Sequence, residues 1–81
     1  MYYDHLQGAL EAVLFTAGEP ISVSEIAELL QIEKPQVWEL LATLTKAYEA
    51  ENRGVMVREI AGGYQLVTKP EYYTLLAQLE T

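Results

Sequence analysis

Apolar residues recur at helical spacing near the start of the chain. Over residues 5–17 they repeat every three or four positions, which is typical of one face of an amphipathic helix, and this stripe comprises Leu6, Leu10, Val13, Leu14 and Ala17. Phe15 falls nearly opposite the stripe. A helix with apolar residues on two faces is either central in its domain or covered by a partner. Gly18 and Pro20 end the helix, because glycine suits a left-handed C-cap and proline cannot continue a helix.

A second helix is predicted after a short extended link at Ile21. Ser22 and Glu25 have the spacing of a capping box, in which each residue caps the other's backbone N–H. The helix that they start runs to about Leu30. Its apolar face comprises Val23, Ile26, Ala27 and Leu30.

A third helix is predicted from Pro35, which suits a first helical position, to about Glu51. Its apolar stripe comprises Val37, Leu40, Leu41, Leu44, Ala47 and Tyr48. The run Asn52-Arg53-Gly54 supplies the stop.

Two β-rich runs, residues 55–61 and 64–69, flank Gly62 and Gly63. A Gly-Gly pair between such runs favours a two-residue hairpin turn in which both positions take a positive φ. Pro70 then opens a last helical segment, with Tyr72, Leu75, Leu76 and Leu79 on one face. This order of elements predicts an α+β winged helix: a helix-turn-helix with a two-stranded wing, three core helices and a C-terminal helical segment, over residues 1–81.

Composition excludes several classes of site. The 81 residues, 51% of them hydrophobic, allow one core. The absence of cysteine excludes disulfides, thiolate zinc sites and a cysteine nucleophile, and a single histidine, His5, excludes a histidine-rich metal site. Asp4 and His5 read as a solvated helix start, and Gly62-Gly63 belongs to a hairpin, not to a phosphate loop. We therefore expect no catalysis, cofactor, metal or small-molecule substrate.

Charge argues against nucleic-acid binding by this domain. Twelve acidic residues face five basic ones, a net charge of −7, whereas phosphate contacts need several cations on one surface. The helix that would enter the major groove has an outward face of Glu39, Ala42, Thr43, Lys46 and Ala50, a poor set for reading base edges. No transmembrane or targeting segment is evident, so we expect a cytoplasmic protein without membrane contact.

An interaction module remains, and six residues are candidates for its surface. Trp38 lies off the core stripe of its helix, with Thr45 beside it, and either packs at the edge of the core under the hairpin or serves as an interface anchor. Phe15 lies opposite its stripe, and Tyr73 lies off the stripe of the last helix. Tyr2 and Tyr3 sit at the chain start, where they either fray or dock onto a partner. For Tyr48 and Tyr72, which lie on stripes, core packing is the better interpretation.

Two runs of sequence resemble a known family. Residues 10–21, LEAVLFTAGEPI, look like the opening helix and turn of segregation and condensation protein B (ScpB), and residues 61–72, AGGYQLVTKPEY, resemble its wing and exit. Tyr48 and Arg53-Gly54 also fall where the family pattern expects them. The resemblance covers essentially the whole chain.

The resemblance implies a non-catalytic subunit of the bacterial condensin-like SMC complex. It implies two winged-helix domains, of which this chain is the first, and a homodimer. It further implies binding to the kleisin ScpA, through it to the SMC ATPase, and a cytoplasmic location at the nucleoid. Gly18, Pro20, Gly62 and Gly63 match family positions that are structural, in the turn and the wing.

The chain ends at Thr81, without a second winged helix. Since much of the kleisin contact in the family involves that second domain, dimerisation is the expected role of this one. The alternative is a winged-helix transcription regulator whose cations lie in a missing part of the chain.

Overall fold

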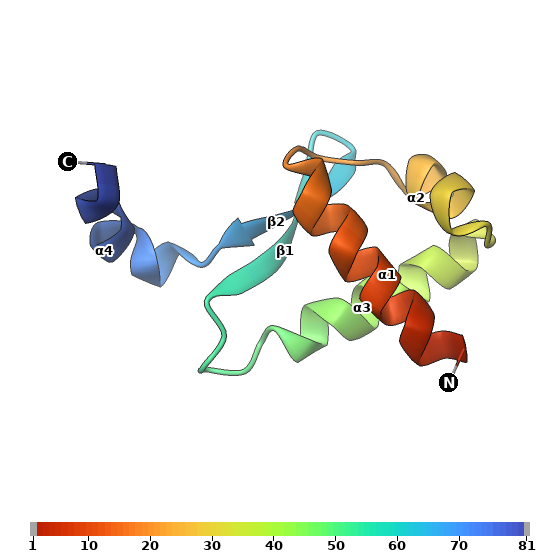
Figure 1. Cartoon of the computed structure of the whole chain (residues 1–81), viewed down its shortest axis with the longest axis horizontal. Coiled ribbons are helices and arrows are strands. Elements are labelled where there is room, and N and C mark those ends of the chain that lie inside the picture. Colours follow the sequence, from red (N-terminus) through yellow and green to blue (C-terminus); the bar gives the residue numbers. More distant parts are fainter. Residues whose placement is uncertain (1, 81) are drawn as a thin grey trace.

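The computed structural model describes residues 2–80, with side chains described for residues 5–79. Three helices are followed by an antiparallel hairpin and a short helical end (Figure 1). The elements are α1 (Tyr2–Ala17), α2 (Val23–Leu30), α3 (Lys34–Ala47), β1 (Val55–Ile60), β2 (Gly63–Thr68), a 3₁₀ turn (Pro70–Tyr72), α4 (Tyr73–Ala77) and a second 3₁₀ turn (Gln78–Glu80). This is the α+β winged-helix arrangement that the sequence predicts.

The core lies where the three helices and the first strand meet. Its buried residues are Leu6, Leu10, Leu14, Ile26, Val37, Leu40, Leu41, Leu44, Tyr48 and Val57. Most of the stripe residues predicted for the first three helices are among them. Two assignments are wrong at the edges of the stripes: Val13 is only half-buried, in a shallow hollow beside Leu29, and Ala47 is exposed. Both lie where no neighbouring element covers the side of the helix.

The predicted capping box starts α2 as expected. Ser22 Oγ accepts from the Glu25 N–H at 3.1 Å, and Glu25 Oε1 accepts from the Ser22 N–H at 3.1 Å. The helix ends at Leu30, where Gln31 takes a left-handed conformation with φ 58°.

The third helix ends at Ala47, so the prediction that it runs to about Glu51 is wrong. Beyond Ala47 the chain forms turns closed by hydrogen bonds to the carbonyl three residues earlier. The Glu49 N–H donates to Lys46 O, and the Arg53 N–H donates to Ala50 O. The carbonyl of Ala50 also accepts from Lys69 Nζ at 3.1 Å. The segment after α3 is therefore shaped by its contact with the end of the wing.

The hairpin turn consists of Ala61 and Gly62, so the prediction of a Gly62-Gly63 turn is displaced by one residue. Ala61 has φ 51° and Gly62 has φ 79°, while Gly63 has no positive φ and is already in β2, opposite Ile60. Gly63 is required for another reason. A Cβ there would lie 2.9 Å from the backbone N of Ile21.

Ile21 adds one residue of strand to the wing. Its N–H donates to Tyr64 O at 3.0 Å, and its carbonyl accepts from the Tyr64 N–H at 2.8 Å. Gly18, with φ 67°, turns the chain from α1 toward this contact. The link after α1 thereby ties the hairpin to the helical body.

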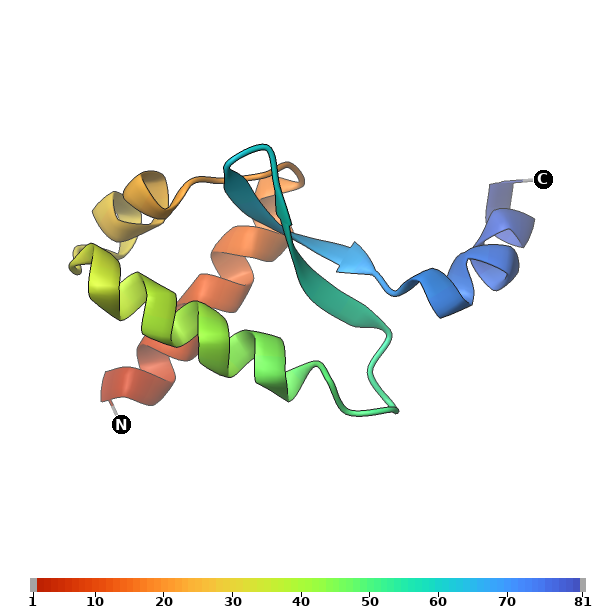
Figure 2. The same ribbon diagram turned by 180° about the vertical axis from the view of Figure 1, so that it is seen from behind.

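Residues 70–80, here called the C-terminal arm, project away from the body in both views (Figures 1 and 2). Of its described residues, the tyrosines and leucines are neither part of the core nor among the half-buried apolar residues packed against it. Leu75, Leu79 and Tyr73 are 61%, 83% and 49% exposed. The interpretation of Tyr72 as a core residue is therefore wrong, because Pro70 starts the arm in a direction that leads away from the core.

Candidate protein-interaction surface

The predicted interface residues lie on separate surfaces of the molecule. Phe15, on the outer side of α1, is 78% exposed. Trp38 is 52% exposed and lines a hollow between the start of α2 and the hairpin tip, beside Ser22 and Tyr64. Thr45 is half-buried near the start of the arm, and Tyr73 lies on the arm itself. The side chains of Tyr2 and Tyr3 fall outside the described ones.

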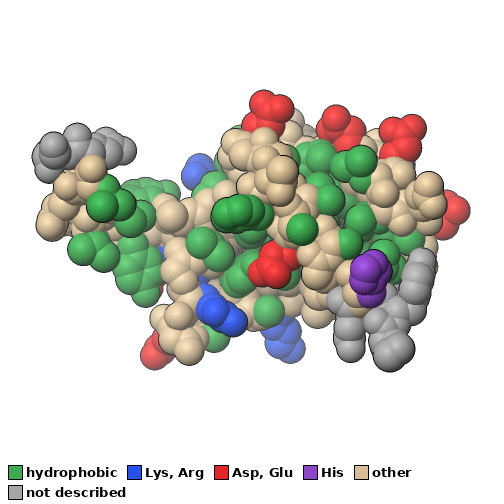
Figure 3. Space-filling model, in the orientation of Figure 1, with side chains coloured by type: hydrophobic (Ala, Val, Ile, Leu, Met, Phe, Trp, Pro, Cys, Tyr) green, Lys and Arg blue, Asp and Glu red, His purple; other side chains and the backbone are tan. Residues whose placement is uncertain are grey.

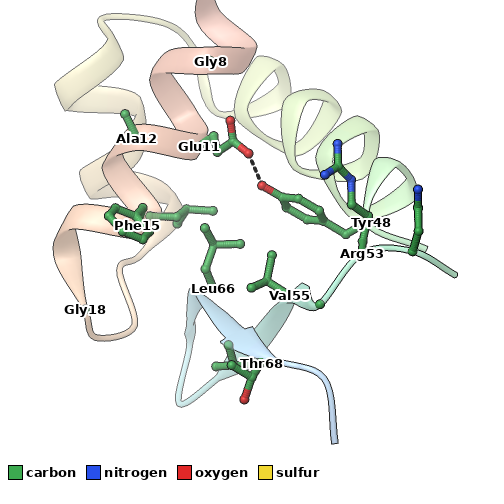
Figure 4. Close-up of a pocket in the computed structure, with 14 residues that line it drawn as sticks. Gly8, Glu11, Ala12, Phe15, Gly18, Tyr48, Arg53, Val55, Leu66 and Thr68 are labelled. Atoms are coloured by element: carbon green, nitrogen blue, oxygen red, sulfur yellow. Dashed lines mark hydrogen bonds between the residues drawn. The ribbon is translucent and has the colours of Figure 1, made fainter. Parts of the chain in front are cut away.

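A large hollow lies beside Phe15 and is here called the α1–wing groove. It has a volume of about 710 Å³ and is bounded by α1, by residues 52–54 after α3, and by the base of the wing. Its walls include Phe15, Tyr48, Arg53, Val55 and Leu66 (Figure 4). Phe15 is the only one of these that the sequence analysis marked as an interface candidate.

One polar contact crosses the groove. The Tyr48 hydroxyl donates a hydrogen bond to Glu11 Oε2, joining the end of α3 to α1 (Figure 4). Burial raises the pKa of Tyr48 to about 12, and the hydrogen bond to Glu11 and the negative charge of Glu11 act in the same direction. The charge of Arg53 acts in the opposite direction. Tyr48 is therefore a neutral donor that fixes the spacing of the two helices.

The Tyr48–Glu11 contact predicts a loss of stability at high pH. The folded state holds the phenol proton more tightly than the unfolded chain, in which the pKa is near the ordinary 10.0. The stabilisation is complete below pH 10 and is lost as the pH rises from about 10 to about 12, because the unfolded state ionises first. We expect the free energy of unfolding to fall by about 2 kcal/mol over this range, measured by urea denaturation.

Tyr48→Phe is the matched control, because it keeps the buried ring and removes only the hydroxyl. The variant is expected to be about 1 kcal/mol less stable than the parent at neutral pH and, because it has no phenol to ionise, about 1 kcal/mol more stable than the parent near pH 12. An equal fall in both proteins would contradict the role of this hydroxyl.

The surface offers little for metal binding or for proton transfer at neutral pH. Within residues 5–79 no group of three or more His, Asp or Glu side chains is placed to hold a metal ion. The raised pKa of Tyr48 is the reverse of what a base working near pH 7 needs. None of the helices in the described chain has the length and apolar character needed to cross a membrane.

The face in Figure 3 shows how apolar and charged side chains are distributed. Hydrophobic side chains are prominent on the arm and are scattered over the body, and acidic side chains are also spread around the body. Basic side chains are few there, in keeping with five Lys and Arg against twelve Asp and Glu. This arrangement suits contact with apolar protein surface better than contact with phosphates.

Comparison with known proteins identifies the family. A family model described as "Segregation and condensation complex subunit ScpB" matches residues 8–81. The chain belongs to the ScpB family. The segregation and condensation protein B of Moorella thermoacetica is 45% identical over 71 residues, which are 88% of this chain and 36% of that protein. The Symbiobacterium thermophilum protein of the same name is 42% identical over 88% of this chain and 32% of its own length. This ScpB chain thus spans about a third of the length of these curated relatives.

Solved structures show the same fold. A crystal structure titled as a dimer of the ScpB N-terminal domain complexed with ScpA peptide has a TM-score of 0.93 and 29% identity, covering 98% of this ScpB chain and 99% of that chain. A conserved hypothetical protein from Chlorobium tepidum matches with a TM-score of 0.83 and 30% identity over 96% of this chain and 49% of its own. ScpB from Mycobacterium tuberculosis, at 19% identity, shares the fold with a TM-score of 0.89, also over 49% of its chain.

Proposed function

We propose that this chain is the N-terminal winged-helix domain of an ScpB protein and works as a non-catalytic assembly module. It forms a homodimer and helps to bind the kleisin ScpA, and through ScpA it joins the SMC ATPase in condensing and segregating the chromosome in the cytoplasm. The observation that carries the proposal is the end-to-end match to a domain that was crystallised as a dimer with an ScpA peptide.

The surface of the chain supports an assembly role. Large apolar side chains are left more than half exposed in a domain of 81 residues, among them Phe15 on α1, Trp38 on α3, and Leu75 and Leu79 on the arm. Large apolar side chains left exposed on several surfaces of so small a domain are typical of a protein with more than one contact to partners. The acidic charge and the poor outward face of α3 favour a protein partner over DNA.

The relatives are longer than this chain, which is the basis for a second domain. Because the chain matches about a third of the curated relatives and 49% of two solved chains, we place residues 1–81 as the first of two winged-helix domains. The second domain would supply further contacts to ScpA.

Light scattering over a concentration series, followed by titration with an ScpA peptide, tests the proposal. We expect twice the mass of one chain at micromolar concentration and saturable binding of the peptide. A duplex DNA titration at low salt is the counter-test. If the chain stays monomeric and does not bind the peptide, the proposal is contradicted. Tight, salt-sensitive binding of DNA would favour the transcription-regulator alternative.

A further inference from the structure

We propose that the homodimer forms by reciprocal exchange of the C-terminal arms. The arm of each copy, residues 70–80, packs its apolar side chains into the α1–wing groove of the other copy. This inference rests on the proposed dimerisation and specifies the surfaces that perform it.

The arm needs an apolar partner that its own body does not supply. Tyr73, Leu75 and Leu79 are exposed, and none of the three is among the apolar residues that form the core or pack against it. A helical segment this short is marginal in water on its own, and most helical stability in proteins comes from packing of an apolar face. The arm is therefore a helix whose stabilising contact lies outside its own chain.

The α1–wing groove has the complementary surface. Phe15 stands out from α1 with 78% of its surface exposed, and Val55 and Leu66 form the opposite wall (Figure 4). The volume of about 710 Å³ is enough for more than one leucine or tyrosine side chain. An arm seated there would cover the most exposed apolar side chain of the body.

Charge also matches the arm to the groove. The arm carries carboxylates at Glu71 and Glu80 and no cation. The groove contributes Arg53, while its own carboxylate, Glu11, already accepts from Tyr48. The approach of an acidic arm therefore brings opposite charges together at the rim, which favours the correct register.

The position of the groove makes the exchange symmetric. Val67 and Thr68, at the end of β2 and close to the start of the arm, line the same groove that Phe15 lines. A two-fold axis beside this point places each arm on the other copy's groove, so that both copies use the same two surfaces. The reciprocal contact is made twice, which helps two short segments to approach the 1,200 Å² or so of a stable interface.

The dimeric ScpB domain provides an independent argument. A TM-score of 0.93 over 98% of this chain requires that the arm follow the same course in that domain as here. The apolar side chains of Tyr73, Leu75 and Leu79 are not packed against the core of the same chain, so they give the arm little reason within the monomer to keep one direction. A partner copy that holds the arm supplies that reason.

Charge-insertion variants test the two surfaces separately. Leu75→Glu on the arm and Phe15→Glu in the groove are each expected to raise the dimer dissociation constant at least tenfold, because each buries an unpaired carboxylate. Leu29→Glu is the matched control: Leu29 is 61% exposed, as is Leu75, but lies on α2 outside both surfaces, so no change is expected. Circular dichroism checks that all three variants stay folded.

Cross-linking identifies which residues meet. The chain has no cysteine, so Phe15→Cys and Leu79→Cys chains can be mixed and treated with a short bis-maleimide. We expect F15C–L79C cross-links between chains, well above those between L29C and L79C. Equal yields would overturn the exchange, as would an intramolecular cross-link in a monomeric F15C/L79C double variant.

The outcomes separate the inference from the proposed function. If the parent chain is a dimer and Leu75→Glu leaves its dissociation constant unchanged, the arm exchange is wrong and dimerisation stands. If the parent chain is a monomer at all concentrations, dimerisation and the arm exchange both fail. An ScpA peptide that occupies the groove while the dimer stays intact would assign the groove to the kleisin and overturn the exchange.

Discussion

Leu10→Ala is expected to lower the free energy of unfolding by about 3–4 kcal/mol. Leu10 is fully buried, at 0% exposure, in the core that α1 shares with the other helices. Removing its isobutyl group loses the transfer free energy and leaves a cavity that a close-packed core cannot fully close. A domain of 81 residues has a total stability of about 4–12 kcal/mol, so the loss is a large fraction of it.

Urea denaturation measures the effect of Leu10→Ala as a lower midpoint with an unchanged slope. The protein concentration must be matched between variants, because dimerisation adds to apparent stability by mass action. The control is Leu29→Ala, the same substitution at a side chain that is 61% exposed, for which a change within about 0.5 kcal/mol is expected. Similar losses in the two variants would contradict the assignment of Leu10 to the core.

Gly63→Ala is expected to cost about 2–3 kcal/mol, although the added methyl group is small. A Cβ at this position would lie 2.9 Å from the backbone N of Ile21 and 3.1 Å from its C and O atoms. These are backbone atoms held by the two hydrogen bonds between Ile21 and Tyr64, so they cannot move aside without breaking those bonds. The strain is that of overpacking, with the loss of the wing's tie to the body added.

Gly8→Ala is the matched control for Gly63→Ala and should have the opposite sign. Gly8 lies within α1, and a Cβ there meets nothing within 4 Å. Replacing a helical glycine with alanine stabilises a protein by about 0.5–1 kcal/mol, so thermal unfolding should shift upward. If Gly63→Ala also raised the unfolding temperature, the close approach of Ile21 would be disproved.

The helices were predictable because their signals are local. The capping box at Ser22 and the stripe of α3 depend on residues within a few positions of one another, and both are present in the structure. The displaced hairpin turn was not predictable in this way. Two glycines in a row indicate a turn. Only the contact with Ile21, 42 residues earlier, shows that Gly63 allows the two backbones to approach closely and that the turn consists of Ala61 and Gly62.

The groove was less accessible from sequence than the fold. Phe15 could be marked because it lies opposite the stripe of its own helix. Arg53, Val55 and Leu66 could not, because nothing in the local pattern relates the end of α3 and the two strands to one face of α1. The same limit explains Tyr72: periodicity shows that the last segment has an apolar face, but not that the body lies elsewhere.

The separation of the arm from the core has a consequence for the evolution of this chain. The free-energy effects of substitutions at positions with no shared contacts add, so the exposed apolar side chains of Tyr73, Leu75 and Leu79 and the core of the three-helix body contribute to stability separately. Substitutions in the arm are therefore constrained mainly by binding to other molecules and much less by folding of the body. Preference for a partner can therefore change through substitutions in the arm, while substitutions in the body are limited to those that its close-packed core accommodates.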